Sequence, residues 1–162
     1  MPLRTEWLRL DQRSADAVSP EDGDIWYNDS DGKHRRRENG ATVSIGVAPA
    51  LLAEATGTST TTSATDVLMD SMTLTPPAGT YIVWFSGSVY GSTGSVTVSL
   101  SIYVDGAQEA SSERFHVGSD FASFCAMALV TVNGSKAMEG RWNTSSGTAT
   151  TDDRTLILQE VI

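Results

Sequence analysis

The segment from Pro76 to Val89 constrains the fold of this chain more than any other. It opens with two prolines and a glycine, which end the preceding segment, and continues with β-branched and aromatic residues typical of strands. Side chains of a strand alternate between its faces, which places Tyr81, Val83 and Phe85 on one face and Ile82 and Trp84 on the other. Because both faces are apolar, this strand needs cover on two sides. A second sheet can cover one face, and a neighbouring subunit can cover the other.

The composition predicts an all-β chain. Its 162 residues suffice for one ordinary domain and a small appendage, and Ser, Thr, Gly and Val dominate over typical helix formers. The net charge of −9 argues against nucleic acid as a partner, because phosphate binding needs a basic surface. No segment approaches the ~20 apolar residues of a membrane span, so we expect no membrane insertion. The single cysteine, Cys125, cannot form an internal disulfide, and residues 1–10 lack a secretory signal pattern, which favours folding in a cytoplasm.

Residues 66–162 show strand patterns separated by turns at the spacing of a β-sandwich. The expected strands are 68–75, 80–90, 95–104, 107–112, 113–117, 121–132, 136–143 and 154–162, with a polar loop at 144–153. The segment 96–104 alternates strictly, with apolar side chains on one face only. By contrast, the segments 81–89, 121–130 and 155–162 are apolar on both faces. Such a pattern predicts a jelly-roll knob whose outer sheet face packs against another subunit.

Residues 1–45 differ in composition from the remainder. They contain 7 of the 11 basic and 9 of the 20 acidic residues, a net charge of −2, whereas the remainder carries −7. Short strands are expected at 23–28, 33–37 and 41–45, joined by turns at 29–32 and 38–40. The sequence therefore predicts a β-meander module at 1–45. Residues 46–65 are either a flexible linker or a polar edge strand, because threonine suits both.

Four segments of the knob resemble the tumour-necrosis-factor-like and complement-globular-head jelly rolls. They are AGTYIVWFS at 78–86, SIYVDG at 101–106, MALVTVNG at 127–134 and RTLIL at 154–158, and the resemblance covers about residues 58–162. In that family the Gly-Thr-Tyr strand and the C-terminal strand line a threefold axis. The resemblance therefore implies a homotrimer. Its interface would include Tyr81, Ile82, Trp84, Phe124, Leu156 and Leu158.

The module resembles a segment that recurs in tailed-phage fibre and virion proteins. The matching motifs are GDIWYN at 23–28, DGK at 31–33 and RENG at 37–40. This resemblance implies a virion protein, assembled in the host cytoplasm, that attaches to a phage capsid or tail protein through the module. Trp26, Tyr27, Arg35 and Arg37 are the expected attachment residues, although Arg35 and Arg37 also fit a charge-paired surface within the module.

The sequence offers little chemistry. Tyr27 stands where a calcium loop at 27–38 would need an oxygen ligand, and Cys125 with His116 and Asp120 does not form a recognisable catalytic pattern. We therefore expect a non-enzymatic protein without cofactor or metal. We expect Cys125 to be buried on an apolar strand face. The possible ligand-binding residues are Arg141 and Trp142, next to the polar loop.

These observations favour a structural protein of a phage particle, trimeric, with a jelly-roll knob on an attachment module. The alternative is a receptor- or carbohydrate-binding tip that contacts a host surface glycan through loops 91–95, 107–120 and 144–153.

Overall fold

A computed structural model describes residues 11–30, 32–45, 50–109 and 111–161 of the chain. All regular structure in these residues is β-strand, as the composition predicts. The described residues form two compact units, 11–45 and 50–161, which we call the module and the knob.

The module is one four-stranded sheet. Its strands are β1 (Asp11–Arg13), β2 (Ile25–Asn28), β3 (Lys33–Glu38) and β4 (Ala41–Ile45), in the order β1-β2-β3-β4. Strands β2, β3 and β4 form the predicted antiparallel meander, and Asn39 and Gly40 make its second turn with positive φ angles of 49° and 73°. Strand β1 pairs in parallel with β2 and was not apparent in the sequence.

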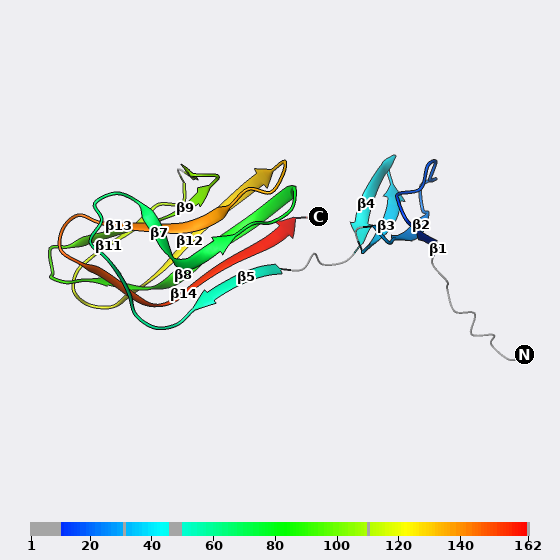
Figure 1. Ribbon diagram of the computed structural model, residues 1–162. Coiled ribbons are helices and arrows are strands. Elements are labelled where there is room, and N and C mark those ends of the chain that lie inside the picture. Colours follow the sequence, from blue (N-terminus) through cyan, green and yellow to red (C-terminus); the bar gives the residue numbers. More distant parts are fainter. Residues whose placement is uncertain (1–10, 31, 46–49, 110, 162) are drawn as a thin grey trace, which may run out of the picture. The chain divides into compact units, whose positions relative to one another are not determined.

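The knob contains ten strands in two sheets (Figure 1). One sheet has the order β12-β8-β14-β5, with β6 also paired to β14, and we call it the large-strand sheet. The other has the order β10-β9-β13-β7, with β11 also paired to β9. The strands are β5 (Ala50–Ala55), β6 (Ser59–Thr61), β7 (Val67–Leu74), β8 (Gly79–Gly91), β9 (Thr97–Val104), β10 (Ala107–Gln108), β11 (Arg114–Val117), β12 (Ala122–Val132), β13 (Met138–Thr144) and β14 (Ala149–Val161).

The pairing of these strands is that of a jelly roll. The first strand β5 pairs with the last strand β14, β7 pairs with β13, β8 with β12, and β9 with β11. The chain therefore folds back on itself as a long antiparallel ribbon that is wrapped into two sheets. Further pairing of β14 with β8 and of β13 with β9 joins these strand pairs into the two sheets. The fold class predicted from the sequence is confirmed by this arrangement.

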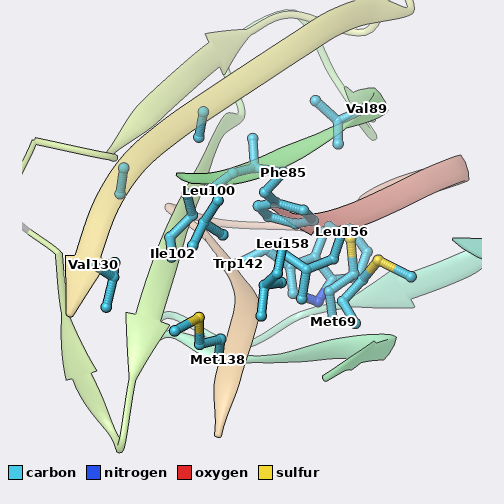
Figure 2. Close-up of a cluster of buried hydrophobic side chains, with 14 of the residues drawn as sticks. Met69, Phe85, Val89, Leu100, Ile102, Val130, Met138, Trp142, Leu156 and Leu158 are labelled. Atoms are coloured by element: carbon cyan, nitrogen blue, oxygen red, sulfur yellow. The ribbon is translucent and has the colours of Figure 1, made fainter. Parts of the chain in front are cut away.

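The core lies between the two sheets of the knob. Figure 2 shows Trp142 and Phe85 surrounded by Leu156, Leu158 and Met69, side chains that come from both sheets. All five are at most 1% exposed. Gly140 is buried beside them, and a Cβ built on it would lie 2.5 Å from Cε2 of Phe85. The aromatic ring thus occupies the space that any other residue at position 140 would need.

Two segments of the knob bear on the expectations from the sequence. The first decides between a linker and an edge strand, and the second is a loop that is shorter than expected. Residues 50–55 and 59–61 are strands of the large-strand sheet, so part of the segment 46–65 that the structure describes is sheet edge. The expected loop 144–153 is shorter, because Ala149, Thr150 and Thr151 already belong to β14 and are buried. Thr150 and Thr151 pair with β6 on one side and with β8 on the other. Threonine is β-branched and therefore suits a strand, although its side chain is polar.

A buried arginine joins three segments of the knob. Arg154 is 4% exposed and donates from Nε to the carbonyl oxygen of Asp70 (2.9 Å) and from Nη1 to that of Gly57 (2.9 Å). Its Nη2 lies 3.0 Å from Oδ2 of Asp70, whose side chain is largely exposed. Carbonyl oxygens therefore satisfy most of the buried guanidinium, and the carboxylate partner remains in water.

Candidate interaction surface

The outward face of the large-strand sheet carries two mainly apolar rows that cross four of its five strands. The strand register aligns Met127, Trp84, Ile157 and Leu52 in one row. The next row contains Leu129, Ile82, Gln159 and Ala50. These side chains alternate with the core residues of the same strands and therefore point away from the core. We call these two rows the apolar face.

The apolar face is exposed in the single chain. Leu52, Met127 and Leu129 are 53%, 54% and 68% exposed, and Ile82, Trp84 and Ile157 are half-buried. The two rows extend about 14 Å along the strands and about 19 Å across four of them, an area of roughly 270 Å². That area is about a third of the ~800 Å² that each partner contributes to a standard protein interface. The apolar face therefore has the size of the apolar centre of an interface, with polar rows around it.

Almost no charge lies on or beside the apolar face. The adjoining row is Cys125, Ser86, Thr155 and Glu54, and Glu54 is the one charged residue among these three rows. Edge strand β12 has eleven residues without charge or proline and pairs with β8 without interruption. Natural edge strands usually carry charged residues or prolines, which prevent association with other chains. A hollow of about 320 Å³ lined by Ile82, Ser111, Met127, Ala128 and Leu129 lies along this edge.

The structure places the six predicted interface residues on two different faces. Ile82 and Trp84 lie on the apolar face. Tyr81, Leu156 and Leu158 are at most 2% exposed and belong to the core, which leaves them no surface for a neighbouring subunit. Phe124 also points inward, with its ring 4.9 Å from that of Phe85 in an edge-to-face contact. The interface assignment of these four residues is therefore corrected.

Six of the eight residues of the apolar face were not named from the sequence as interface residues, and Leu52, Met127, Leu129 and Ile157 are the large apolar ones among them. Alternation places Met127 and Leu129 on one face of their strand, but alternation alone does not tell which face is outward. The register between β12, β8, β14 and β5 decides this, and it is set by pairings distant in sequence.

Cys125 lies on the outward side of β12 and is exposed, contrary to the expected burial. The alternation that buries Ala126 and Ala128 turns Cys125 outward. His116, which the sequence grouped with it, is instead within 3.0 Å of the carbonyl oxygen of Asp120 through Nε2.

The outward face of the second sheet is polar over its central strands β9 and β13, whereas Phe115 and Val117 of β11 and Leu68 of β7 are exposed apolar residues on its outer strands. Tyr103 donates to Asp66 Oδ2 (2.5 Å), and Asn143 Nδ2 donates to Asp66 Oδ1 (2.7 Å). Arg141 donates from Nε to Glu139 (2.8 Å), and its guanidinium carbon lies 4.6 Å from the Tyr103 ring centre. Burial, followed by the hydrogen bond and charge of Asp66, raises the pKa of Tyr103 to about 12. The two outward faces of the knob therefore differ in chemistry.

Arg141 and Trp142 do not form the predicted ligand site. Arg141 is engaged by Glu139 and Tyr103, and Trp142 is 1% exposed in the core. Adjacent residues of a strand point to opposite faces, so only one of the two can face solvent, and the apolar ring is the one buried. The assignment of Trp142 as a surface aromatic is corrected.

Three loops meet at one end of the knob. Ser92 donates its backbone N–H to Thr148, and Gly91 donates to Gly118, which joins the loops around residues 92, 118 and 147. Phe121 is 60% exposed beside this end, with its ring 4.4 Å from that of Tyr90. Parts of the three loops proposed for ligand binding are thus brought together, and Phe121 is an exposed aromatic that the sequence did not single out.

In the module, three of the four predicted attachment residues lie on the inner face of the sheet. Trp26 is 3% exposed. Arg35 donates to Ser44 (2.5 Å) and lies 3.6 Å from Asp16, and Arg37 contacts Thr42 at 3.4 Å. The charge pairing within the module that the sequence allowed is therefore present for Arg35 with Asp16, whereas Arg37 contacts a hydroxyl group. Tyr27 alone lies on the opposite face, with its ring 5.0 Å from that of His34.

Two features of other kinds of site, a cluster of metal ligands and a long apolar helix, are absent from the described residues. No group of three or more His, Cys, Asp or Glu residues gathers to bind a metal ion in the part of the chain that the structure describes. Nor do these residues form a helix long and apolar enough to cross a membrane.

Comparison with solved structures finds distant likenesses. Eiger TNF from S. frugiperda is similar over 71% of this chain and 94% of its own, with 10% identity and a TM-score of 0.49. The VP2 subviral particle of infectious bursal disease virus matches 88% of this chain, with 8% identity and a TM-score of 0.49, and this chain spans 41% of that protein. A CBM36-1 domain of a xylanase from the hindgut metagenome of Trinervitermes trinervoides has 8% identity over 67% of this chain and 96% of its own, with a TM-score of 0.41.

No protein-family model and no curated protein sequence matches the chain. The structural likenesses are weaker than a shared function would require, so the strand pairing described above carries the assignment of the fold. It is the apolar face that points to a function.

Proposed function

We propose that this protein is a non-enzymatic structural component of a tailed-phage particle that assembles as a homotrimer through the apolar face of its knob. The observation that carries the proposal is the exposure of Leu52, Met127 and Leu129 on two rows of a sheet face that carry no charged residue. An exposed apolar patch with polar residues around it is typical of an interaction surface.

A second copy of the chain fits this face better than an unrelated charged partner. Glu54 supplies the one charge in the three rows, so the face cannot select a partner by charge complementarity, and packing of apolar side chains must dominate. The knob carries a net charge of −7, and burying an uncharged face avoids the repulsion that a charged face would create between copies.

The virion role is proposed from the resemblance of residues 23–40 to phage fibre and virion segments. In this proposal the module attaches the knob to a capsid or tail protein. Because Trp26 and Arg35 are engaged inside the module, the attachment surface must use other module residues.

The first test measures the native mass of the full chain by light scattering, for the wild type and for Met127→Asp. We expect a trimer for the wild type, and a folded monomer for the variant because a charge would be buried in the contact. Cys125→Ser is the matched control, since it changes an outward residue of the same strand without adding charge. A monomeric wild type at micromolar concentration would refute the proposal.

The second candidate function is a receptor- or glycan-binding tip. The observation that favours it is the meeting of three loops beside Phe121, whose exposed ring next to Tyr90 could stack on a sugar. Glycan-array binding by the wild type that is lost in Phe121→Ala, with the native mass unchanged, would support this function. Absence of binding to any glycan would leave the structural role as the better account.

A further inference from the structure

Among the described residues of the module, one face of the sheet is covered and the other is bare. The register aligns Trp26, Arg35 and Ser44 on one face, and the connection between β1 and β2 covers this face through Asp16. Asp16 accepts a hydrogen bond from Asn28 Nδ2 (2.9 Å) and lies 3.6 Å from Nε of Arg35. The opposite face carries two rows, Ile25-Arg36-Val43 and Tyr27-His34-Ile45. We call these two rows the bare face.

The bare face exposes apolar side chains on a sheet that is too small to stand alone. Ile25 and Ile45 are 45% and 38% exposed, and Tyr27 and Val43 are half-buried. A single small sheet is marginally stable unless its apolar face is covered, and it usually needs a disulfide, a metal or association with other chains. The module contains no cysteine, so no disulfide can stabilise it. A partner that covers Ile25, Tyr27, Val43 and Ile45 would supply the missing apolar contact.

Charge on the bare face favours a copy of the module over a strongly charged partner. Arg36 and Glu38 both lie on this side of β3 and form an ion pair of 2.6 Å with each other. The opposite charges of Arg36 and Glu38 therefore balance each other on this face. A face balanced in this way does not repel its own copy and offers no excess charge to an acidic or a basic protein.

Chain length brings the copies close together. Four residues, 46–49, separate β4 from β5, and four residues span at most about 14 Å. If the knobs form a trimer, three modules are tethered by these short segments, and short tethers give effective concentrations on the order of millimolar. A contact too weak to form between free modules then forms within the trimer. The bare face, with three strands of about 15 Å, is of that weak kind.

We propose that the bare faces of the three modules pack against one another in the assembled protein. The inference rests on the proposed trimer. It assigns Ile25, Tyr27, Val43 and Ile45 to a second contact between copies. The module would then be stable only in the trimer, and attachment to the particle would use the remaining surface of the module.

Cross-linking of the full chain tests which molecule covers the bare face. In a Cys125→Ser background, Ile45→Cys is treated with a short bismaleimide, and Val18→Cys serves as the control because Val18 is 98% exposed and lies outside the bare face. We expect covalent dimers for Ile45→Cys well above the Val18→Cys level. Equal yields in a protein that light scattering shows to be trimeric would overturn this inference and leave the proposed trimer standing.

Amide hydrogen exchange supplies the second readout. We expect exchange in residues 25–45 to rise about tenfold or more in Ile25→Asp, with the trimer intact and Val18→Asp unchanged. The same rise is expected in the Met127→Asp monomer, although that substitution lies in the other unit. Unchanged protection in both Ile25→Asp and the monomer would show that the bare face needs no copy, and would also overturn the inference. A monomeric wild type would instead refute the proposed function.

Discussion

Single residues in the knob show where the core tolerates no change. Gly140 lies against the ring of Phe85, and Trp142 two residues later fills the centre of the core. Neither residue is recognisable as buried from the sequence, because a glycine in a polar strand and a tryptophan beside an arginine are both typical of exposed positions. Their positions follow from contacts with β8, which is distant in sequence, and no local pattern predicts them.

Gly140→Ala is expected to destabilise the protein by about 1–3 kcal/mol, because the added methyl group must displace the Phe85 ring. Phe85→Leu shortens the opposing side chain and should itself cost stability. In the double variant the cost of Gly140→Ala should be smaller than in the wild-type background. Urea unfolding of the four proteins gives this coupling energy. Strict additivity would show that the two residues do not compete for space.

Arg154→Lys is expected to cost about 1–3 kcal/mol, because lysine cannot reach the carbonyl oxygens of Asp70 and Gly57 together. Asp70→Asn should cost less than about 1 kcal/mol, since the Asp70 side chain is largely exposed to solvent. Thermal unfolding of both variants compares the two contributions. A larger loss for Asp70→Asn would mean that the ion pair, rather than the carbonyl contacts, holds Arg154.

Tyr103 should make the stability of the knob depend on alkaline pH. Burial and the Asp66 hydrogen bond raise its pKa from 10.0 to about 12, so the folded state holds the phenol proton more tightly than the unfolded state. This stabilisation is complete below about pH 10 and is lost as the pH rises towards about 12. Urea midpoints of the wild type should therefore fall more steeply than those of Tyr103→Phe over this interval. Parallel curves would contradict the assignment.

At the scale of strands, the sequence predicts well how side chains alternate between the two faces, and it predicts poorly which face points to the core. The alternation at 96–104 correctly places Val98, Leu100 and Ile102 in the core, although Ser101 on the opposite face is buried as well, and the turn at Asp105-Gly106 lies where expected. The segments that are apolar on both faces are strands of the large-strand sheet, and in each of them one face lies in the core while the other points outward. Which face is exposed depends on the register between strands that are distant in the chain. Strands β1 and β6 were less visible because they have three residues each, and β5 because its alanines and leucines are not typical strand formers.

The two faces of the large-strand sheet should respond differently to the same substitution. Ile82→Asp lies on the apolar face and is expected to break the association between copies while costing less than about 1 kcal/mol of monomer stability. Phe124→Asp places a charge against the core ring of Phe85 and should destabilise the fold by at least about 2 kcal/mol. Light scattering and near-ultraviolet circular dichroism separate the two effects. Unfolding of both variants would mean that Ile82 also belongs to the core.

At the scale of the whole molecule, the two units differ in what makes them stable. The knob buries a continuous core between its sheets, including residues from β7, β8, β9, β12, β13 and β14. The module is a thin sheet with a single buried tryptophan and several polar contacts. We therefore expect the knob to drive assembly, and a fragment of residues 46–162 to have three times its monomer mass on light scattering. A monomeric fragment with a trimeric full chain would reverse the roles of the two units.

The response of the trimer to salt follows from the chemistry of the apolar face. Screening at high ionic strength weakens contacts between opposite charges and leaves apolar contacts intact. Because Glu54 is the one charge in the three rows of this face, and the knob carries a net charge of −7, added salt should not dissociate the trimer and should reduce repulsion between copies. Sedimentation at dilute concentration should therefore show an equal or larger trimer fraction in about 1 M than in about 0.05 M sodium chloride. Dissociation by salt would require a contact made by charged residues, and the polar face with Arg141 and Glu139 would then be the surface to test.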